Sequence, residues 1–150
     1  MNDQIPDPRL GPDTLRSVEL TRIGPMTLEA RNARGEVLRV GSGDSADFTP
    51  VELLLVALGA CGAIDLEHVT GKRADPERLD VRVEGHKIRD ESGNHMVGLT
   101  VLLDIAFPEG DAGDRAREVV PRTIQQVQDR LCTVGRTIQV GDAVVYRERD

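Results

Sequence analysis

Apolar residues change their spacing several times along the chain, and each change marks an expected structural element. Three short apolar-rich segments come first, and turn residues such as Gly24-Pro25 separate them. Short spacing between such segments favours antiparallel hairpins. We expect strands at about 15–23, 26–32 and 35–40, followed by a small polar loop from Gly41 to Asp47.

The longest apolar stretch runs from Val51 to Leu66 and predicts a helix. Thr49 can cap this helix, Pro50 suits its first turn, and Glu52 occupies the acidic position of a capping box. We expect the helix to end near Gly71-Lys72. Because its residues are apolar on every side, the helix needs cover on every side. One sheet covers one face, so we expect a second copy of the protein to cover the rest.

Two strands with alternating apolar and polar residues are predicted next, at about Leu79–Glu84 and Leu99–Phe107. A polar turn from Arg89 to Asn94 lies between them. The alternation indicates that each strand has one buried and one solvated face.

The C-terminal part of the chain predicts one amphipathic helix and two strands. Apolar residues recur at spacings of three and four from about Asp111 to Leu131, which is the helical period. Pro121 lies inside this helix and should kink or split it. A last pair of strands is expected at about 136–140 and 143–148. The resulting order, β-β-β-α-β-β-α-β, is that of an α+β domain.

The length and charge of the chain narrow its functional classes. Its 150 residues suit one domain, which we assign to residues 15–150 behind a flexible N-terminal arm at residues 1–14. The net charge of −7 disfavours nucleic acid and anionic membranes as partners. No apolar run reaches the roughly 18 residues of a membrane span, and the N-terminus lacks a signal peptide's features. A cytoplasmic location is therefore expected.

The chain has two cysteines, Cys61 and Cys132, which form no Cys-x-x-Cys pair and have no histidine at zinc-binding spacing. A single cysteine in an apolar helix is often just a small buried hydrophobic residue. A permanent disulfide is a further alternative, although the cytoplasm disfavours one. Composition alone leaves these interpretations open.

The segments around both cysteines resemble the OsmC/Ohr family of osmotically inducible and organic-hydroperoxide-resistance proteins. The resemblance is carried by three motifs: Thr49-Pro50-Val51-Glu52-Leu53-Leu54-Leu55, Gly59-Ala60-Cys61 and Arg130-Leu131-Cys132-Thr133-Val134-Gly135-Arg136-Thr137. It extends over about residues 15–147, including the order of elements. It implies an OsmC-like fold and an intertwined homodimer with the long apolar helices at its middle.

The resemblance also implies a thiol peroxidase that reduces organic hydroperoxides to alcohols. Cys61 corresponds to the attacking cysteine, whose thiolate becomes a sulfenic acid. Cys132 corresponds to the resolving cysteine, which forms a disulfide with it. A dithiol reductant, a lipoyl-bearing protein in some relatives, then resets the pair. No metal or flavin cofactor is required.

An attacking cysteine needs a nearby positive charge, because an ordinary thiol is mostly protonated at neutral pH. In the family this charge is an arginine from the first hairpin, held by a glutamate that directly follows the proline. Our preferred candidate is Arg22, and Arg31 on the next strand is the other.

The glutamate is where this sequence departs from the family pattern. Val51 directly follows Pro50, and the acid is Glu52. At about 100° of rotation per residue, Glu52 lies on the opposite side of the helix from Cys61. Glu52 is thus a weaker site candidate, and a capping-box acid is its simpler role.

Two other functions stay open beside the peroxidase. The departure at Val51 favours a non-catalytic dimer that binds a small apolar or thiol-bearing ligand, or a redox sensor. A purely structural dimer without a ligand is the third alternative. Asp65, one helical turn after Cys61, would oppose a thiolate, so we expect it to point to solvent or to an arginine.

Overall fold

The computed structural model describes residues 7–149, so residues 1–6 of the predicted arm lie outside the described part. Three strands, a helix and two further strands are followed by two helices with a π-helical turn between them. This mixed α+β architecture confirms the predicted fold class. The chain divides into two compact units, Met1–Glu52 and Leu53–Asp150. The assignment of residues 15–150 to a single domain stays a prediction.

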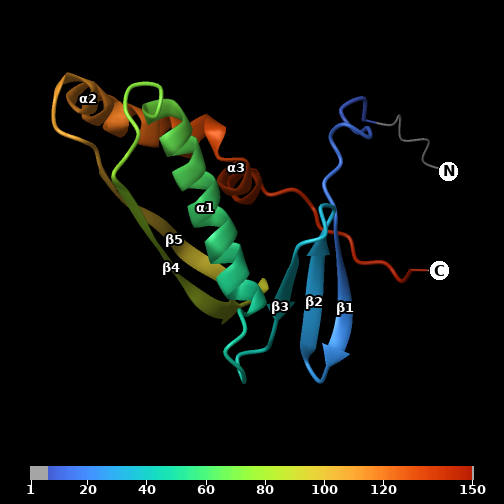
Figure 1. Cartoon of the computed structure of the whole chain (residues 1–150). Coiled ribbons are helices and arrows are strands. Elements are labelled where there is room, and N and C mark those ends of the chain that lie inside the picture. Colours follow the sequence, from blue (N-terminus) through green and yellow to red (C-terminus); the bar gives the residue numbers. More distant parts are fainter. Residues whose placement is uncertain (1–6, 150) are drawn as a thin grey trace. The chain divides into compact units, whose positions relative to one another are not determined.

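The first unit contains a three-stranded antiparallel sheet in the order β1-β2-β3 (Figure 1). Strand β1 spans Val18–Gly24, β2 spans Thr27–Asn32 and β3 spans Val37–Val40. The tight turn between β1 and β2 holds Met26 at a φ of 51°, a left-handed conformation that few non-glycine residues adopt. These strands confirm the three segments predicted from the sequence.

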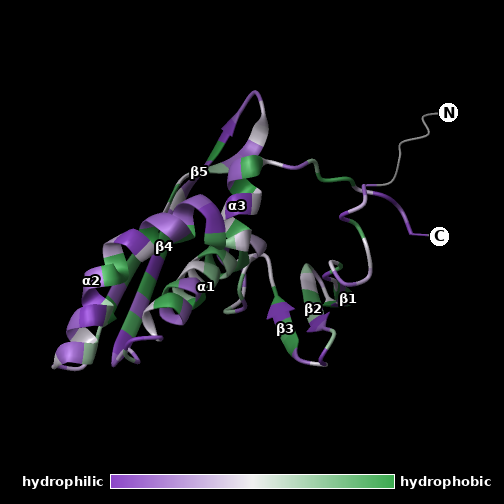
Figure 2. Ribbon diagram, turned by 90° about the horizontal axis from the view of Figure 1, so that it is seen from above, coloured by the Kyte–Doolittle hydropathy of each residue, from purple (hydrophilic) through white to green (hydrophobic). Residues whose placement is uncertain are grey.

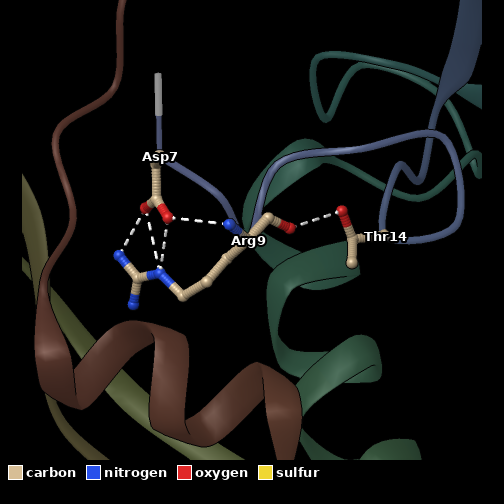
Figure 3. Close-up of polar contacts among 3 residues, drawn as sticks. All are labelled: Asp7, Arg9 and Thr14. Atoms are coloured by element: carbon tan, nitrogen blue, oxygen red, sulfur yellow. Dashed lines mark hydrogen bonds and ion pairs between the residues drawn. The ribbon is translucent and has the colours of Figure 1, made fainter. Parts of the chain in front are cut away.

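A local polar network precedes this sheet (Figure 3). The Nε atom of Arg9 donates to both carboxylate oxygens of Asp7 at 2.9 Å. The Thr14 hydroxyl donates to the Arg9 carbonyl at 3.0 Å. The hydrogen bonds from Arg9 lower the pKa of Asp7 to about 2. Residues 7–14 of the predicted arm are thus linked by hydrogen bonds of their own.

Helix α1 spans Pro50–Thr70 and confirms the long apolar helix. The Thr49 hydroxyl accepts a hydrogen bond from the Glu52 N–H at 3.2 Å and donates one to Glu52 Oε1 at 2.9 Å. Thr49 therefore satisfies one of the backbone donors that the first turn leaves free. The helix stops at Gly71, where its end was predicted.

Strands β4 (Arg78–Asp90) and β5 (Gly93–Ala106) form one long antiparallel hairpin. The prediction of a polar turn over Arg89–Asn94 was too wide, because Arg89 pairs with Asn94 within the ladder. Glu91 and Ser92 alone make the turn. Polar side chains at a solvated hairpin end do not interrupt the backbone hydrogen bonds, so the strands continue beyond the alternating pattern.

Helix α1 packs closely against the β4–β5 hairpin (Figure 1). A Cβ atom at Gly59 would lie 2.4 Å from Cγ2 of Val83 and 3.3 Å from Cγ1 of Val81. Glycine therefore lets the helix approach the sheet at this point. The buried apolar residues of the second unit are Leu58, Ala63, Leu66, Phe107, Ala116, Val127 and Cys132.

Helix α2 spans Asp111–Gln126, and a π-helical turn, η1, follows at Val127–Leu131. Pro121 was predicted to kink or split the helix; it does not split it, because α2 continues through it, and the kink stays a prediction. Pro121 is exposed, so the carbonyl that proline leaves without a donor can bind water. Figure 2 shows both hydrophobic and hydrophilic residues on α2, which an amphipathic helix places on opposite faces.

The predicted final strands at 136–140 and 143–148 were wrong. Helix α3 occupies Thr133–Val140, and residues 142–149 are neither helical nor extended in a sheet. Cys132 caps the helix at its start, and Gly141, with a φ of 72°, ends it in the left-handed conformation. Both caps favour a helix over a strand. The last element of the predicted order is therefore α rather than β.

One side of α1 is apolar and exposed. The exposed fractions of Leu54, Val56 and Ile64 are 37%, 47% and 65%. By length and composition alone, α1 is also apolar enough to cross a membrane, with a mean hydropathy of 1.6. The prediction that no segment spans a membrane rested on uninterrupted apolar residues, and it stays a prediction.

Candidate functional site

Three side chains from two helices meet in the second unit. Cys61 and Asp65 lie one turn apart on α1, and Cys132 lies at the N-cap of α3. Their two sulfur atoms and one carboxylate oxygen all lie within 4.8 Å of one another. Both cysteines are free thiols, Cys132 buried and Cys61 half-buried. The structure thus brings together the two predicted site cysteines.

The turn between η1 and α3 positions Cys132. The Cys132 N–H donates to the Val127 carbonyl at 3.1 Å, the wide bond of a π-helical turn. The Gly135 N–H donates to the Cys132 sulfur at 3.3 Å. A Cβ atom at Gly135 would lie 3.3 Å from this sulfur and 3.4 Å from Cδ1 of Leu58. Glycine therefore leaves room for the sulfur and for Leu58 of α1.

The surroundings of Cys132 raise the pKa of its thiol. Burial raises the pKa of this thiol, and the nearby Cys61 and Asp65 raise it further. The hydrogen bond from the Gly135 N–H acts in the opposite direction, because it favours a thiolate. Burial is the largest of these effects, so the pKa of the Cys132 thiol lies above its ordinary value.

Asp65 was expected to point to solvent or to an arginine, and the structure differs. Its Oδ2 atom is buried and has no hydrogen-bond partner in the described part of the chain. A buried polar atom of this kind is rare in folded proteins. The i, i+4 spacing from Cys61 to Asp65 already put both on one helix face. The expectation that like charges would turn Asp65 outward was wrong, because packing holds it beside the sulfurs.

A cavity of about 530 Å³ opens beside Cys132. Its wall comes from α1, β5, α2, η1 and α3, and it includes Cys132. Most of the other side chains that line it are apolar: Leu58, Leu99, Val101, Leu103, Ile124, Val127 and Ile138. This arrangement suits a small molecule with an apolar body and a reactive group at the sulfur end.

The structure places the remaining predicted site residues in the first unit. Glu52 caps α1 with Thr49, the simpler of its two predicted roles. Arg22 lies on β1 and Arg31 on β2, where Arg31 donates to Glu29 at 3.2 Å. The roles of Arg22 and Glu52 beside Cys61 stay predictions.

Comparisons with known proteins agree on one family. The family model described as OsmC-like protein matches residues 41–146. An uncharacterized protein of Mycobacterium tuberculosis is 33% identical over 125 residues, which cover 82% of this chain and 88% of that protein.

Solved structures share the fold at low sequence identity. An OsmC-like protein of unknown function from Vibrio cholerae matches with a TM-score of 0.72 and 11% identity, over 83% of this chain and 93% of that one. The organic hydroperoxide resistance protein OhrB of Bacillus subtilis matches with a TM-score of 0.51 and 16% identity, over 81% and 90%.

Proposed function

The chain belongs to the OsmC-like protein family, and from this premise we propose that it is a cysteine-based peroxidase that reduces organic hydroperoxides to alcohols. One observation carries the proposal: the sulfurs of Cys61 and Cys132 lie within 4.8 Å of each other as free thiols. The OhrB structure, with a similar fold, is that of an organic hydroperoxide resistance protein.

The proposed reaction has two steps at this pair. The Cys61 thiolate attacks one peroxide oxygen, the O–O bond breaks, and the alkoxide leaves as an alcohol after taking a proton. Cys132 then loses its proton and attacks the sulfur of the sulfenic acid as a thiolate; the S–O bond breaks, hydroxide takes up the proton and leaves as water, and a disulfide forms. The raised pKa of the Cys132 thiol disfavours it as the attacking cysteine of the first step. A dithiol, such as a lipoyl protein in the cytoplasm, would return the pair to thiols.

The cavity supports an organic substrate over hydrogen peroxide. Its wall is mainly apolar, and burial of hydrocarbon in such a site contributes about 0.8 kcal/mol per methylene. Hydrogen peroxide carries no apolar group and gains nothing from this wall. We therefore propose that bulky or long-chain hydroperoxides react fastest.

The exposed side of α1 supports a homodimer as the working form. Leu54, Val56 and Ile64 lie on this side. Val56 also lines a shallow hollow, together with Leu55 and Gly59. An apolar helix face of this kind is usually covered in the native assembly. A second copy of the chain would supply that cover.

A second candidate function is favoured by Glu52. This acid is engaged at the helix cap, and Val51 occupies the place of the family acid. A dimer without peroxidase turnover would then bind an apolar or thiol-bearing ligand in the cavity, or sense oxidants through its cysteines.

Thiol counting separates the peroxidase from a dimer that only binds a ligand. Reduced protein is incubated with cumene hydroperoxide, and its free thiols are counted with a chromogenic reagent. The wild type should lose two thiols, Cys132→Ser one, and Cys61→Ser none. Dimedone should label the Cys132→Ser product as a sulfenic acid. Unchanged thiols in the wild type would favour the binder, and peroxide consumption by Cys61→Ser would reject Cys61 as the nucleophile.

A further inference from the structure

A buried carboxylate oxygen without a partner stands beside two thiols. Asp65 Oδ2 has no hydrogen-bond partner in the described part of the chain, and Asp65 offers one carboxylate oxygen to the cluster with Cys61 and Cys132. Burying such an atom without compensation costs free energy. The peroxidase cycle assigns no role to Asp65. A cation, a proton or a water bound at this carboxylate oxygen would compensate its burial.

The three donors form a set typical of one class of metal. Thiolate sulfur binds soft or borderline cations such as Zn²⁺, and a carboxylate commonly completes such a site. Magnesium and calcium prefer oxygen alone. In a tetrahedral zinc site, bonds of about 2.3 Å to sulfur and about 2.1 Å to oxygen put neighbouring donors roughly 3.6–3.8 Å apart. The donors here, all within 4.8 Å, reach that geometry through small side-chain rotations.

We propose that the reduced protein binds one Zn²⁺ per chain through Cys61, Cys132 and Asp65. Both cysteines bind the metal as thiolates, so two thiolates and one carboxylate surround the divalent ion. Three protein ligands leave a fourth tetrahedral position for water or an added small ligand. The cavity is lined by Cys132, one of the three proposed ligands.

The site depends on the redox state of the cysteines. Formation of a Cys61–Cys132 disulfide consumes both thiolate ligands and leaves only Asp65, which cannot hold the ion alone. Oxidation therefore releases the metal, and reduction restores binding. This inference needs only the geometry of the reduced site, so it stands whether or not the protein turns over peroxides.

Metal binding is tested on the full chain after reduction and removal of metal with a chelator. Zn²⁺ is titrated in competition with a chromophoric chelator, with Mg²⁺ as the comparison ion. We expect one Zn²⁺ per chain, with protons released as thiols become thiolate ligands. Co²⁺ should give a thiolate-to-metal charge-transfer band and the visible bands of a tetrahedral site. Octahedral Co²⁺ without a charge-transfer band would overturn the proposal.

Single substitutions test which side chains bind the metal. Cys61→Ser and Cys132→Ser should each lose the charge-transfer intensity of one sulfur and most of the affinity. Asp65→Asn keeps the side-chain shape and should weaken Zn²⁺ binding more than tenfold. Glu67→Gln, at an exposed acid on the same helix, is the matched control and should bind as the wild type does. Equal affinity of Asp65→Asn and Glu67→Gln would remove Asp65 from the site and overturn the three-ligand proposal.

A measurement on the wild type avoids any effect of a variant on folding. Protein oxidised with diamide should lose Zn²⁺ binding, and dithiol treatment followed by removal of the dithiol should restore it. Retained affinity after complete disulfide formation would reject a cysteine site. Peroxide turnover is measured separately on chelator-treated protein, so failure of the metal site and failure of the peroxidase are told apart.

Discussion

The sulfur of Cys61, in the middle of α1, lies within 4.8 Å of the sulfur of Cys132, at the N-cap of α3. Each is a free thiol. The Val127–Leu131 π-helical turn immediately precedes Cys132, and Gly135 leaves room for its sulfur. The two-cysteine chemistry therefore depends on the path of the chain around α3 as much as on α1.

This proximity predicts a disulfide within one chain. Mild oxidation with diamide should remove both thiols and leave a single chain on a non-reducing gel, because the Cys61 and Cys132 sulfurs need only a small movement to bond. Mass spectrometry of the peptides would identify the link. Cys132→Ser serves as the control and should keep its remaining thiol. Chains linked to each other instead would contradict the prediction.

Close packing at Gly59 predicts a stability cost. Gly59→Ala should reduce the free energy of unfolding by about 1–3 kcal/mol, because the added methyl would lie 2.4 Å from Cγ2 of Val83. Gly62→Ala is the matched control on the same helix. Its methyl would lie 3.6 Å from Val127, an ordinary contact, and alanine favours a helix by about 1 kcal/mol over glycine. Denaturant melts followed by circular dichroism give both values. Equal costs would contradict the close approach.

The cap of α1 predicts different effects at Thr49 and Glu52. Thr49→Ala should cost about 1 kcal/mol of stability, because the Glu52 N–H loses its acceptor. Glu52→Gln keeps a side-chain acceptor for the Thr49 hydroxyl and should change stability much less. Thermal melts measure both. If Glu52→Gln instead abolished peroxide-driven thiol loss without affecting stability, Glu52 would act in the site rather than at the cap.

An ion-pair group on the β4–β5 hairpin predicts a pH dependence. Asp80 and Asp104 face each other across the ladder, and Arg78 binds them at 2.9 Å and 2.6 Å. The hydrogen bond from Arg78 lowers the pKa of Asp104 below its ordinary 3.8. Asp104 therefore contributes stability above pH 3.8, and this contribution is lost as the pH falls through its lowered pKa.

Arg78→Gln should accordingly lower the melting temperature at neutral pH, and the difference from the wild type should shrink as the pH falls below 3.8. High salt should reduce the difference as well, because all three side chains are exposed. Arg82→Gln, which breaks an exposed pair with Glu84 on one strand, is the comparison and should have a smaller effect. A difference that is independent of pH would contradict the assignment.

Local signals in the sequence predicted several elements well. Thr49 and Pro50 mark the start of α1, and Gly71 marks its end, because capping chemistry depends on residues a few positions apart. The first hairpin follows from the Gly24-Pro25 turn. These features involve neighbours along the chain, and a sequence shows such neighbours directly.

The tertiary structure decided the features that local patterns describe poorly. The segment Thr133–Val140 alternates like a strand and also repeats like a helix, and the caps at Cys132 and Gly141 select the helix. The motifs around Cys61 and Cys132 identified both cysteines from the sequence, but their distance depends on how α1 packs against η1 and α3. Asp65 turned toward the sulfurs despite its charge, because packing around α1 fixes its direction. Periodicity and capping act between neighbouring residues, whereas the approach of these three side chains is a property of the packed core.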